Sequence, residues 1–251
     1  PPSRVVVPHV TLPYMTKEGR GGPPQPGFFG GFLGHAHDPL FVLRDPNSND
    51  FGVPELTLQT GVSAQRLSVR RRLFDDLNRR AKLGNDDRAA TTMNSFQARA
   101  LDLLTSSGTR SAFQLDAESD ATRDAYGRNI YGQSTLLARR LIEAGTRLVT
   151  IAWAPDANAT SDTHTNNFGK LKTSLLPQFD SAASSLIDDL HRRGLLQRTV
   201  VGIFGDFGRT PKINPKAGRD HWNFCYSLMM VGGGFRKGLI YGRSDSIGGY
   251  P

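Results

Sequence analysis

Two short polar stretches of the sequence combine carboxylates with histidines at spacings that suit metal binding. SDTHTNN contains Asp162 and His164, and GDFGRTPKINPKAGRDHW contains Asp206 and then Asp220 next to His221. Oxygen and imidazole ligands without thiolates suit divalent ions such as zinc, manganese, iron, magnesium or calcium. Two such ions can activate a nucleophile and stabilise charge on a phosphoryl or sulfuryl group. These five residues therefore predict a metal site that serves ester hydrolysis.

Basic side chains share the second stretch with the carboxylates. Arg209, Lys212 and Arg219 lie between Asp206 and His221. Such cations can neutralise a tetrahedral oxyanion, the arginines by bidentate hydrogen bonds. We expect them to bind a substrate anion while the carboxylates and histidines face the metal.

Each of these motifs also has a simpler interpretation. An Asp-x-His or Asp-His pair arises often by chance, and Asp162 or Asp206 can stabilise a turn. Both pairs follow predicted strands, which favours the metal interpretation. His35 and His37, with Asp38, form a further His-x-His pair, but the Asp-Pro sequence that follows favours a turn there.

No hydroxyl of the sequence stands out as a nucleophile. Ser134 begins a predicted helix, which suits an N-cap. Thr163 and Thr210 lie nearer the predicted ligands, but nothing in their spacing marks either as activated. The catalytic nucleophile is therefore unassigned.

The elements that would position these residues are strands and helices of an α/β domain. Apolar, β-branched runs predict strands over 147–153, 199–204 and 225–233, and an amphipathic pattern predicts a helix from about Asn167 to Arg193, ended by Gly194. Side chains that do chemistry in such sheets follow the carboxyl ends of the strands. We therefore expect the loops after 153 and 204 to meet at one edge of one sheet.

The rest of the chain divides into two segments of different character. Residues 1–60 are rich in proline and glycine, and we interpret them as a loop-rich wrapping segment. Residues 61–145 form a helical segment, with helices over 63–83, 92–105 and 133–144, the last ending at Gly145. With the α/β segment 146–251 they make one domain over 1–251.

Composition narrows the class of protein. With 37% hydrophobic and 22% charged residues the chain has a globular composition, and no run approaches the length of a membrane span. The single cysteine excludes an internal disulfide and a thiolate-rich metal site. The net charge of +8 is dispersed along the chain, which favours small anionic substrates over nucleic acid.

Three long stretches carry a resemblance to a known family. YGQSTLLARRLIEAGTRLVTI, DTHTNNFGKLKTSLLPQFDSAASSLIDDLHRRGLL and GDFGRTPKINPKAGRDHW resemble the family named domain of unknown function 1501, abundant in planctomycetes, and GFLGHAHDPLFV and LTLQTGVSAQRLSVRRRLFDDL are similar to it too. The resemblance implies an alkaline phosphatase-like or sulfatase-like fold, with a mixed or mostly parallel sheet flanked by helices. It also implies a metal-dependent hydrolase of phosphate or sulfate esters, including sulfated or phosphorylated saccharides, that is exported to the periplasm or beyond.

The chain also departs from the pattern of that family. Many members have Glu at the position of Asp206, and Phe207 stands where related enzymes of the superfamily have a histidine ligand. Longer relatives begin with a strand and a Gly-Gly-Pro-Ser loop, so the resemblance implies a fragment that lacks the first strand or strands and the nucleophile. The alternative is a non-catalytic member of the same fold, a surface or carbohydrate-binding protein.

Overall fold

The computed structural model describes residues 6–18, 21–58, 61–81, 100–155 and 162–251. The strands are β1 (His9–Leu12), β2 (Leu40–Phe41), β3 (Leu148–Ile151), β4 (Val200–Ile203), β5 (Gly208–Arg209), β6 (His221–Trp222) and β7 (Met229–Gly232). The helices are α1 (Ala64–Ala81), α3 (Ser107–Ala112), α4 (Asp120–Tyr126), α5 (Ile130–Ala144), α6 (Asn167–Lys170) and α7 (Leu176–Arg192). Short 3-10 turns lie at Gly31–Leu33, His35–His37, Pro54–Leu56, Leu115–Ala117 and Leu196–Arg198.

A three-stranded parallel sheet with the order β2-β1-β3 lies at the centre of the molecule. β1 pairs with both neighbours, for example Val10 with Leu40 and with Val149. Val10 and Leu12 of β1 have no exposed surface, so the central strand is the most buried of the three. The prediction of a loop-rich segment over 1–60 did not include this strand, because the prolines and glycines around it outweighed a run of only four residues.

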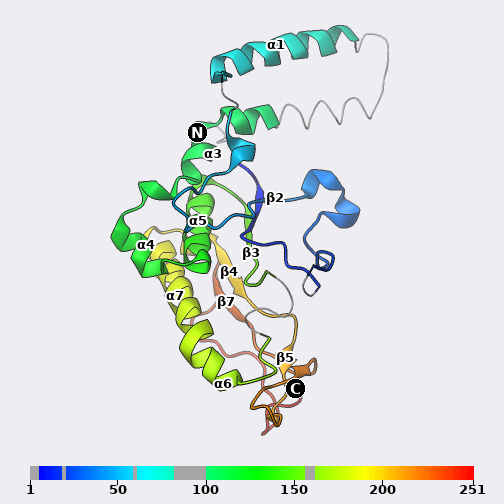
Figure 1. Cartoon of the computed structure of the whole chain (residues 1–251), viewed down its shortest axis with the longest axis vertical. Helices are drawn as coiled ribbons and strands as arrows, with labels where there is room; N and C mark the ends of the chain where they lie inside the picture. Colours follow the sequence, from blue (N-terminus) through cyan, green and yellow to red (C-terminus); the bar gives the residue numbers. More distant parts are fainter. Residues whose placement is uncertain (1–5, 19–20, 59–60, 82–99, 156–161) are drawn as a thin grey trace.

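Helices cover one side of these strands. α4, α5 and α7 pack against one another, and α5 also contacts β3 (Figure 1). Leu136, Leu137 and Leu141 of α5 are fully buried and join the side chains of β1 in the core. Each such side chain contributes about 1.5–3 kcal/mol by leaving water. α1 projects at the end of the molecule opposite β5 and the C-terminus (Figure 1).

The boundaries of α5 show how local sequence sets a helix. The side chain of Asn129 caps its start by accepting hydrogen bonds from the backbone N–H groups of Tyr131 and Gly132. Gly145 ends it in the left-handed conformation, as predicted. The N-cap interpretation of Ser134 was wrong, because Ser134 lies one turn inside the helix and its hydroxyl donates to the Ile130 carbonyl at 2.6 Å.

The predicted helix over 167–193 is divided into three parts. α6 is followed by a π-helical turn at Leu171–Leu175 and then by α7. Pro177 has no N–H to donate to the carbonyl of Thr173, and the helix widens just before it. Gly194 follows α7 with φ +67°, which ends the helix where the sequence predicted.

A buried arginine links several helices. The side chain of Arg139 in α5 is 1% exposed, and its Nε lies 2.8 Å from Asp189 Oδ2 of α7. Its Nη2 lies 2.9 Å from Glu118 Oε2, and its Nη1 donates to Glu143 at 2.9 Å. Tyr126 of α4 also donates to Asp189 Oδ2, at 3.1 Å. These contacts hold α4, α5 and α7 together as one helical layer.

The remaining strands form two small antiparallel pairs. β4 pairs with β7, and β5 pairs with β6 through Gly208–Trp222 and Arg209–His221. In the described part of the chain β3 and β4 belong to separate sheets, so the expectation that they are strands of one sheet was wrong. The protein is nevertheless α/β, with a small parallel sheet and helices.

Two further expectations about the helices can be compared with the structure. Residues 100–105 are helical, whereas the rest of the helix predicted over 92–105 lies outside the described residues. Within the described ranges, every helix is too short or too polar to cross a bilayer.

Candidate metal centre

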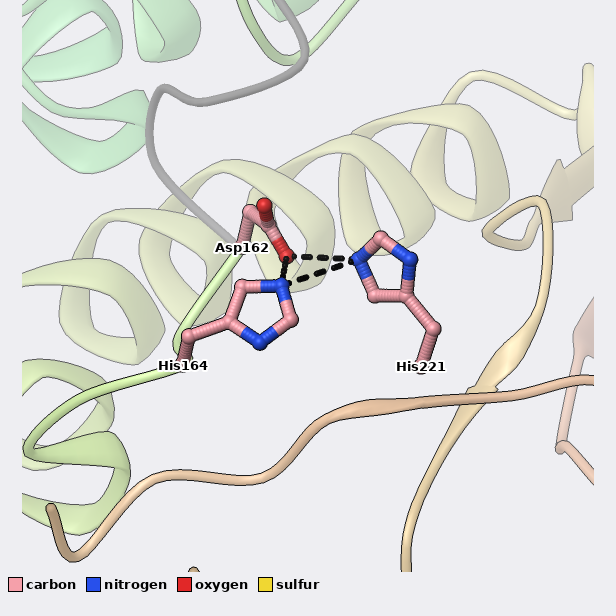
Figure 2. A group of neighbouring side chains, drawn as sticks. All are labelled: Asp162, His164 and His221. Atoms are coloured by element: carbon pink, nitrogen blue, oxygen red, sulfur yellow. Dashed lines mark hydrogen bonds and ion pairs between the residues drawn. The ribbon is translucent and has the colours of Figure 1, made fainter.

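Three side chains from two distant parts of the sequence converge at one point. Asp162 Oδ1 lies 3.1 Å from His164 Nε2 and 3.0 Å from His221 Nε2. The two Nε2 atoms are 3.2 Å apart. Figure 2 shows both rings turned with this nitrogen toward the carboxylate of Asp162. Three of the five predicted ligands thus point their donor atoms at one another.

Two different elements present these residues. Asp162 and His164 lie just before α6, and His221 is the first residue of β6 (Figure 2). The antiparallel pairing of β6 with β5 sets His221 opposite Arg209. The ring of Phe207, centred 4.3 Å from that of His221, packs against the histidine.

The separations between the donor atoms fit a single divalent cation. Metal–ligand bonds of about 2.0–2.2 Å place neighbouring ligand atoms about 2.8–3.1 Å apart in an octahedron and about 3.3–3.6 Å apart in a tetrahedron. The two distances from Asp162 Oδ1, 3.0 and 3.1 Å, fall in the octahedral range. The distance of 3.2 Å between the two Nε2 atoms falls between the octahedral and tetrahedral ranges. Among the described residues, this trio is the one group of three His, Cys, Asp or Glu side chains with such convergence.

Asp220 contacts the opposite side of His164. Its Oδ1 lies 2.7 Å from His164 Nδ1. Hydrogen bonds from His164 and then from Asn214 lower the pKa of the Asp220 carboxyl. Because a carboxylate can only accept, His164 donates this hydrogen bond from Nδ1, and in the neutral ring Nε2 then has the lone pair that a metal would need. Asp220, which the sequence predicted as a ligand, lies outside the trio, in the position that carboxylates often take behind metal-bound histidines.

Arg209 provides positive charge at the edge of the trio. Its Nη1 lies 2.6 Å from Asp162 Oδ1, and the side chain of Asp162 is only 15% exposed. Partial burial alone would raise the pKa of Asp162, but the hydrogen bonds from His221 and Arg209 outweigh it and lower that pKa. The carboxylate is therefore ionised at neutral pH, as a ligand must be.

The loop between β5 and β6 docks on the segment that carries His164. The backbone N–H groups of Asn166 and Asn167 donate to the carbonyls of Lys216 and Ala217, at 3.0 and 2.8 Å. Gly218 makes the closest approach, since a Cβ there would overlap the carbonyl group of His164. This docking brings His221 to His164 across nearly 60 residues of sequence.

Asn214 is a residue of this site that the sequence reasoning missed. It lies in the β5–β6 loop and donates from Nδ2 to Asp220 Oδ1 at 3.1 Å and to the His164 carbonyl at 3.0 Å. The Asn-Pro pair in the sequence predicts a turn at this position. It gives no indication of the contact across the loops.

The other predicted site residues lie outside the trio. Asp206 is exposed, and its carboxylate accepts a hydrogen bond from the backbone N–H of Phe207 at 3.0 Å. Arg219 donates to the backbone carbonyls of Thr210 and Arg209, at 2.6 and 3.1 Å, and so holds the β5–β6 loop. Lys212 is exposed on that loop. Arg209 is thus the predicted substrate-binding cation that directly contacts the centre.

The hydroxyls near the centre are engaged in holding loops. Thr163 is buried and donates to the side-chain oxygen of Asn167. Thr210 donates to the Lys212 carbonyl at 2.8 Å and accepts from the backbone N–H of Asp220 at 3.1 Å. Neither contact activates a nucleophile.

The histidines near the N-terminus form a turn, as the Asp-Pro sequence favoured. His35–His37 is a 3-10 turn, and Asp38 closes it by accepting from the backbone N–H of Gly30 at 2.6 Å. His35 Nδ1 lies 2.8 Å from Asp38 Oδ2. These residues form no group of three convergent ligands within the described chain.

Comparison with known proteins gives one match. No curated protein and no solved structure matches the chain. The profile of a family described as "Protein of unknown function (DUF1501)" matches residues 2–251. The candidate metal centre therefore belongs to a chain that is a member of the DUF1501 family over nearly its whole length.

Proposed function

We propose that this protein is a metal-dependent hydrolase that acts on a sulfate or phosphate ester, with a fold of the alkaline phosphatase and sulfatase type. The observation that carries this proposal is the triangle of donor atoms of Asp162, His164 and His221, with Arg209 on its edge. The resemblance stated above adds that it acts after export and that saccharide esters are among its substrates.

The donor set narrows the identity of the metal. Two imidazoles with one carboxylate suit zinc, manganese or iron better than calcium or magnesium, which prefer oxygen ligands. A bound ion of this kind supplies a Lewis acid and a water of lowered pKa. Three protein ligands leave positions for water and substrate, as catalytic sites require.

Arg209 would orient the ester anion. Its guanidinium already pairs with Asp162, and its side chain is 22% exposed, so it faces both the centre and solvent. A guanidinium binds two oxygens of a sulfuryl or phosphoryl group at once. Phe207 lies under it, with the Arg209 Cζ 6.0 Å from the ring centroid, and restricts where the guanidinium can point.

Metal content and turnover test this function together. We expect the protein to hold a first-row divalent metal, to hydrolyse aryl phosphates or aryl sulfates, and to lose turnover after chelation and regain it when metal is returned. His221→Ala should lose both metal and turnover. His191→Ala, in the last turn of α7, is a matched histidine control that should change neither.

The outcomes separate the two candidate functions. Metal bound at the trio without turnover on either class of ester would indicate the non-catalytic alternative, a surface or carbohydrate-binding protein. Turnover that persists after complete metal removal would refute the hydrolase mechanism.

A further inference from the structure

Asn214 joins the two halves of the candidate metal centre, and the inference that follows rests on that centre as proposed above. The residue lies in the β5–β6 loop, six positions before Asp220. Its side chain makes four hydrogen bonds, two from its amide nitrogen and two to its oxygen. Its hydrogen-bonding capacity is therefore fully used.

The two ends of the Asn214 amide have separate partners. Oδ1 accepts from the backbone N–H groups of Lys216 and Gly218, both at 2.9 Å, and so stabilises the loop itself. Because those two donors must face an oxygen, the amide orientation is fixed. Nδ2 therefore faces Asp220 Oδ1 and the carbonyl of His164.

We propose that Asn214 is a positioning residue that holds His164 in the orientation for metal binding. Asp220 Oδ1 accepts from both His164 Nδ1 and Asn214 Nδ2, at 2.7 and 3.1 Å. The same Nδ2 fixes the main chain of His164 through its carbonyl. Asn214 thus restrains the His164 ring through Asp220 and the His164 backbone through its carbonyl. Both restraints keep Nε2 directed at the centre.

The exposure of Asp220 explains why such a restraint is needed. Its side chain is 50% exposed, and that of His164 is 42% exposed. A half-exposed carboxylate would otherwise sample several rotamers and exchange His164 for water, at a cost in conformational entropy when metal binds. The second donor from Asn214 removes that freedom before the metal arrives.

Asn214→Ser separates the two roles of the side chain. A serine hydroxyl can accept from the backbone N–H two residues on and so keep the turn, but it is too short to reach Asp220 and adds no charge. Lys216→Ala is the matched control, because Lys216 contributes backbone groups to the same loop. The measurements are Zn²⁺ affinity by calorimetry, the visible spectrum with Co²⁺, and thermal unfolding of the metal-free protein.

The expected result is a loss of metal affinity without a loss of fold. Asn214→Ser should bind Zn²⁺ about 10–100-fold more weakly, the usual effect of removing a residue that supports a metal ligand. It should give an altered Co²⁺ spectrum and unfold near the wild-type temperature. Lys216→Ala should match the wild type in all three.

Two results would overturn the proposal. One is wild-type Zn²⁺ affinity in Asn214→Ser, and the other is a metal-free Asn214→Ser protein that unfolds far below the wild type, which would assign Asn214 to the loop alone. None of the three measurements uses an ester substrate. A wild-type protein that binds metal but turns over no ester would therefore refute the proposed function and leave this inference standing.

Discussion

At the scale of single residues, the carboxylates around the centre differ in what they contact. Asp162 directs Oδ1 at both Nε2 atoms, Asp220 contacts the far nitrogen of His164, and Asp206 accepts from its own neighbour in sequence. The structure thus assigns three carboxylates with the same chemistry to three different positions relative to the candidate metal.

These positions predict three different effects of the same Asp→Asn change. Asp162→Asn removes the anionic ligand and should abolish Zn²⁺ binding in a calorimetric titration. Asp220→Asn keeps the shape but weakens the hold on His164 Nδ1, and affinity should fall about 10–100-fold. Asp206→Asn should bind like the wild type. Equal losses in Asp206→Asn and Asp162→Asn would show that the trio is not the metal site.

At the scale of elements, the centre depends on how closely the β5–β6 loop approaches the segment before α6. The backbone hydrogen bonds between 166–167 and 216–217 leave no room for a side chain at Gly218. Ala217 beside it has φ +53°, an unusual conformation for alanine that the docked loop maintains.

Gly218→Ala should therefore destabilise the protein and weaken metal binding. The new Cβ would overlap the His164 carbonyl, and relieving that overlap by moving the loop costs about 1–3 kcal/mol of unfolding free energy. Gly205→Ala is the matched control, since a Cβ there meets its nearest neighbour, the Phe207 carbonyl oxygen, at 3.6 Å. Denaturant unfolding and Zn²⁺ titration of both variants would check this, and a wild-type stability for Gly218→Ala would contradict it.

The elements also show what can be predicted from sequence in this protein. α5 and the end of α7 follow from local signals, because apolar periodicity and a terminal glycine act within a few residues. β1 could not be recognised in the same way, since four residues between prolines become a strand only through pairing with β2 and β3.

The residues of the candidate site likewise fall into those that could be predicted from sequence and those that could not. Residue types identified Asp162, His164 and His221, because imidazole and carboxylate pairs are visible in the sequence itself. The roles of Asp220 and Asn214 could not be predicted, since they depend on which atom of His164 each one reaches across the docked loops. The sequence near each residue does not show how closely two loops that are far apart in the chain approach each other.

At the scale of the whole molecule, the charged cluster around Arg139 holds the helical layer together. Burial alone would raise the pKa of Glu118, but the hydrogen bonds and charges of Arg139 and Arg140 outweigh it and lower that pKa. Asp189 follows the same logic, with burial opposed by Arg193 and Arg139, and its pKa is also lowered. Both groups are ionised in the folded protein at neutral pH.

Stability should therefore fall in acid. A carboxyl whose folded pKa lies below its unfolded pKa contributes stability above the unfolded value, about 4 for these groups, and loses it as pH falls through the folded value. Glu118→Gln should lower the unfolding free energy at pH 7 by about 1.5–3 kcal/mol and flatten its dependence on pH below 4. Asp116→Asn, an exposed neighbour, is the control. Denaturant unfolding between pH 3 and pH 7 measures both, and identical pH profiles for Glu118→Gln and the wild type would contradict the assignment.

The origin of the three ligands in two separate segments has a further consequence for the whole chain. An ion held by Asp162, His164 and His221 would act as a cross-link that closes a loop of nearly 60 residues, which includes α6, α7, β4 and β5. A cross-link that closes such a loop lowers the conformational entropy of the unfolded chain, much as a disulfide does. For a chain with a single cysteine, the metal would take the structural place of a covalent bridge, so the metal-loaded protein should resist unfolding more than the metal-free one.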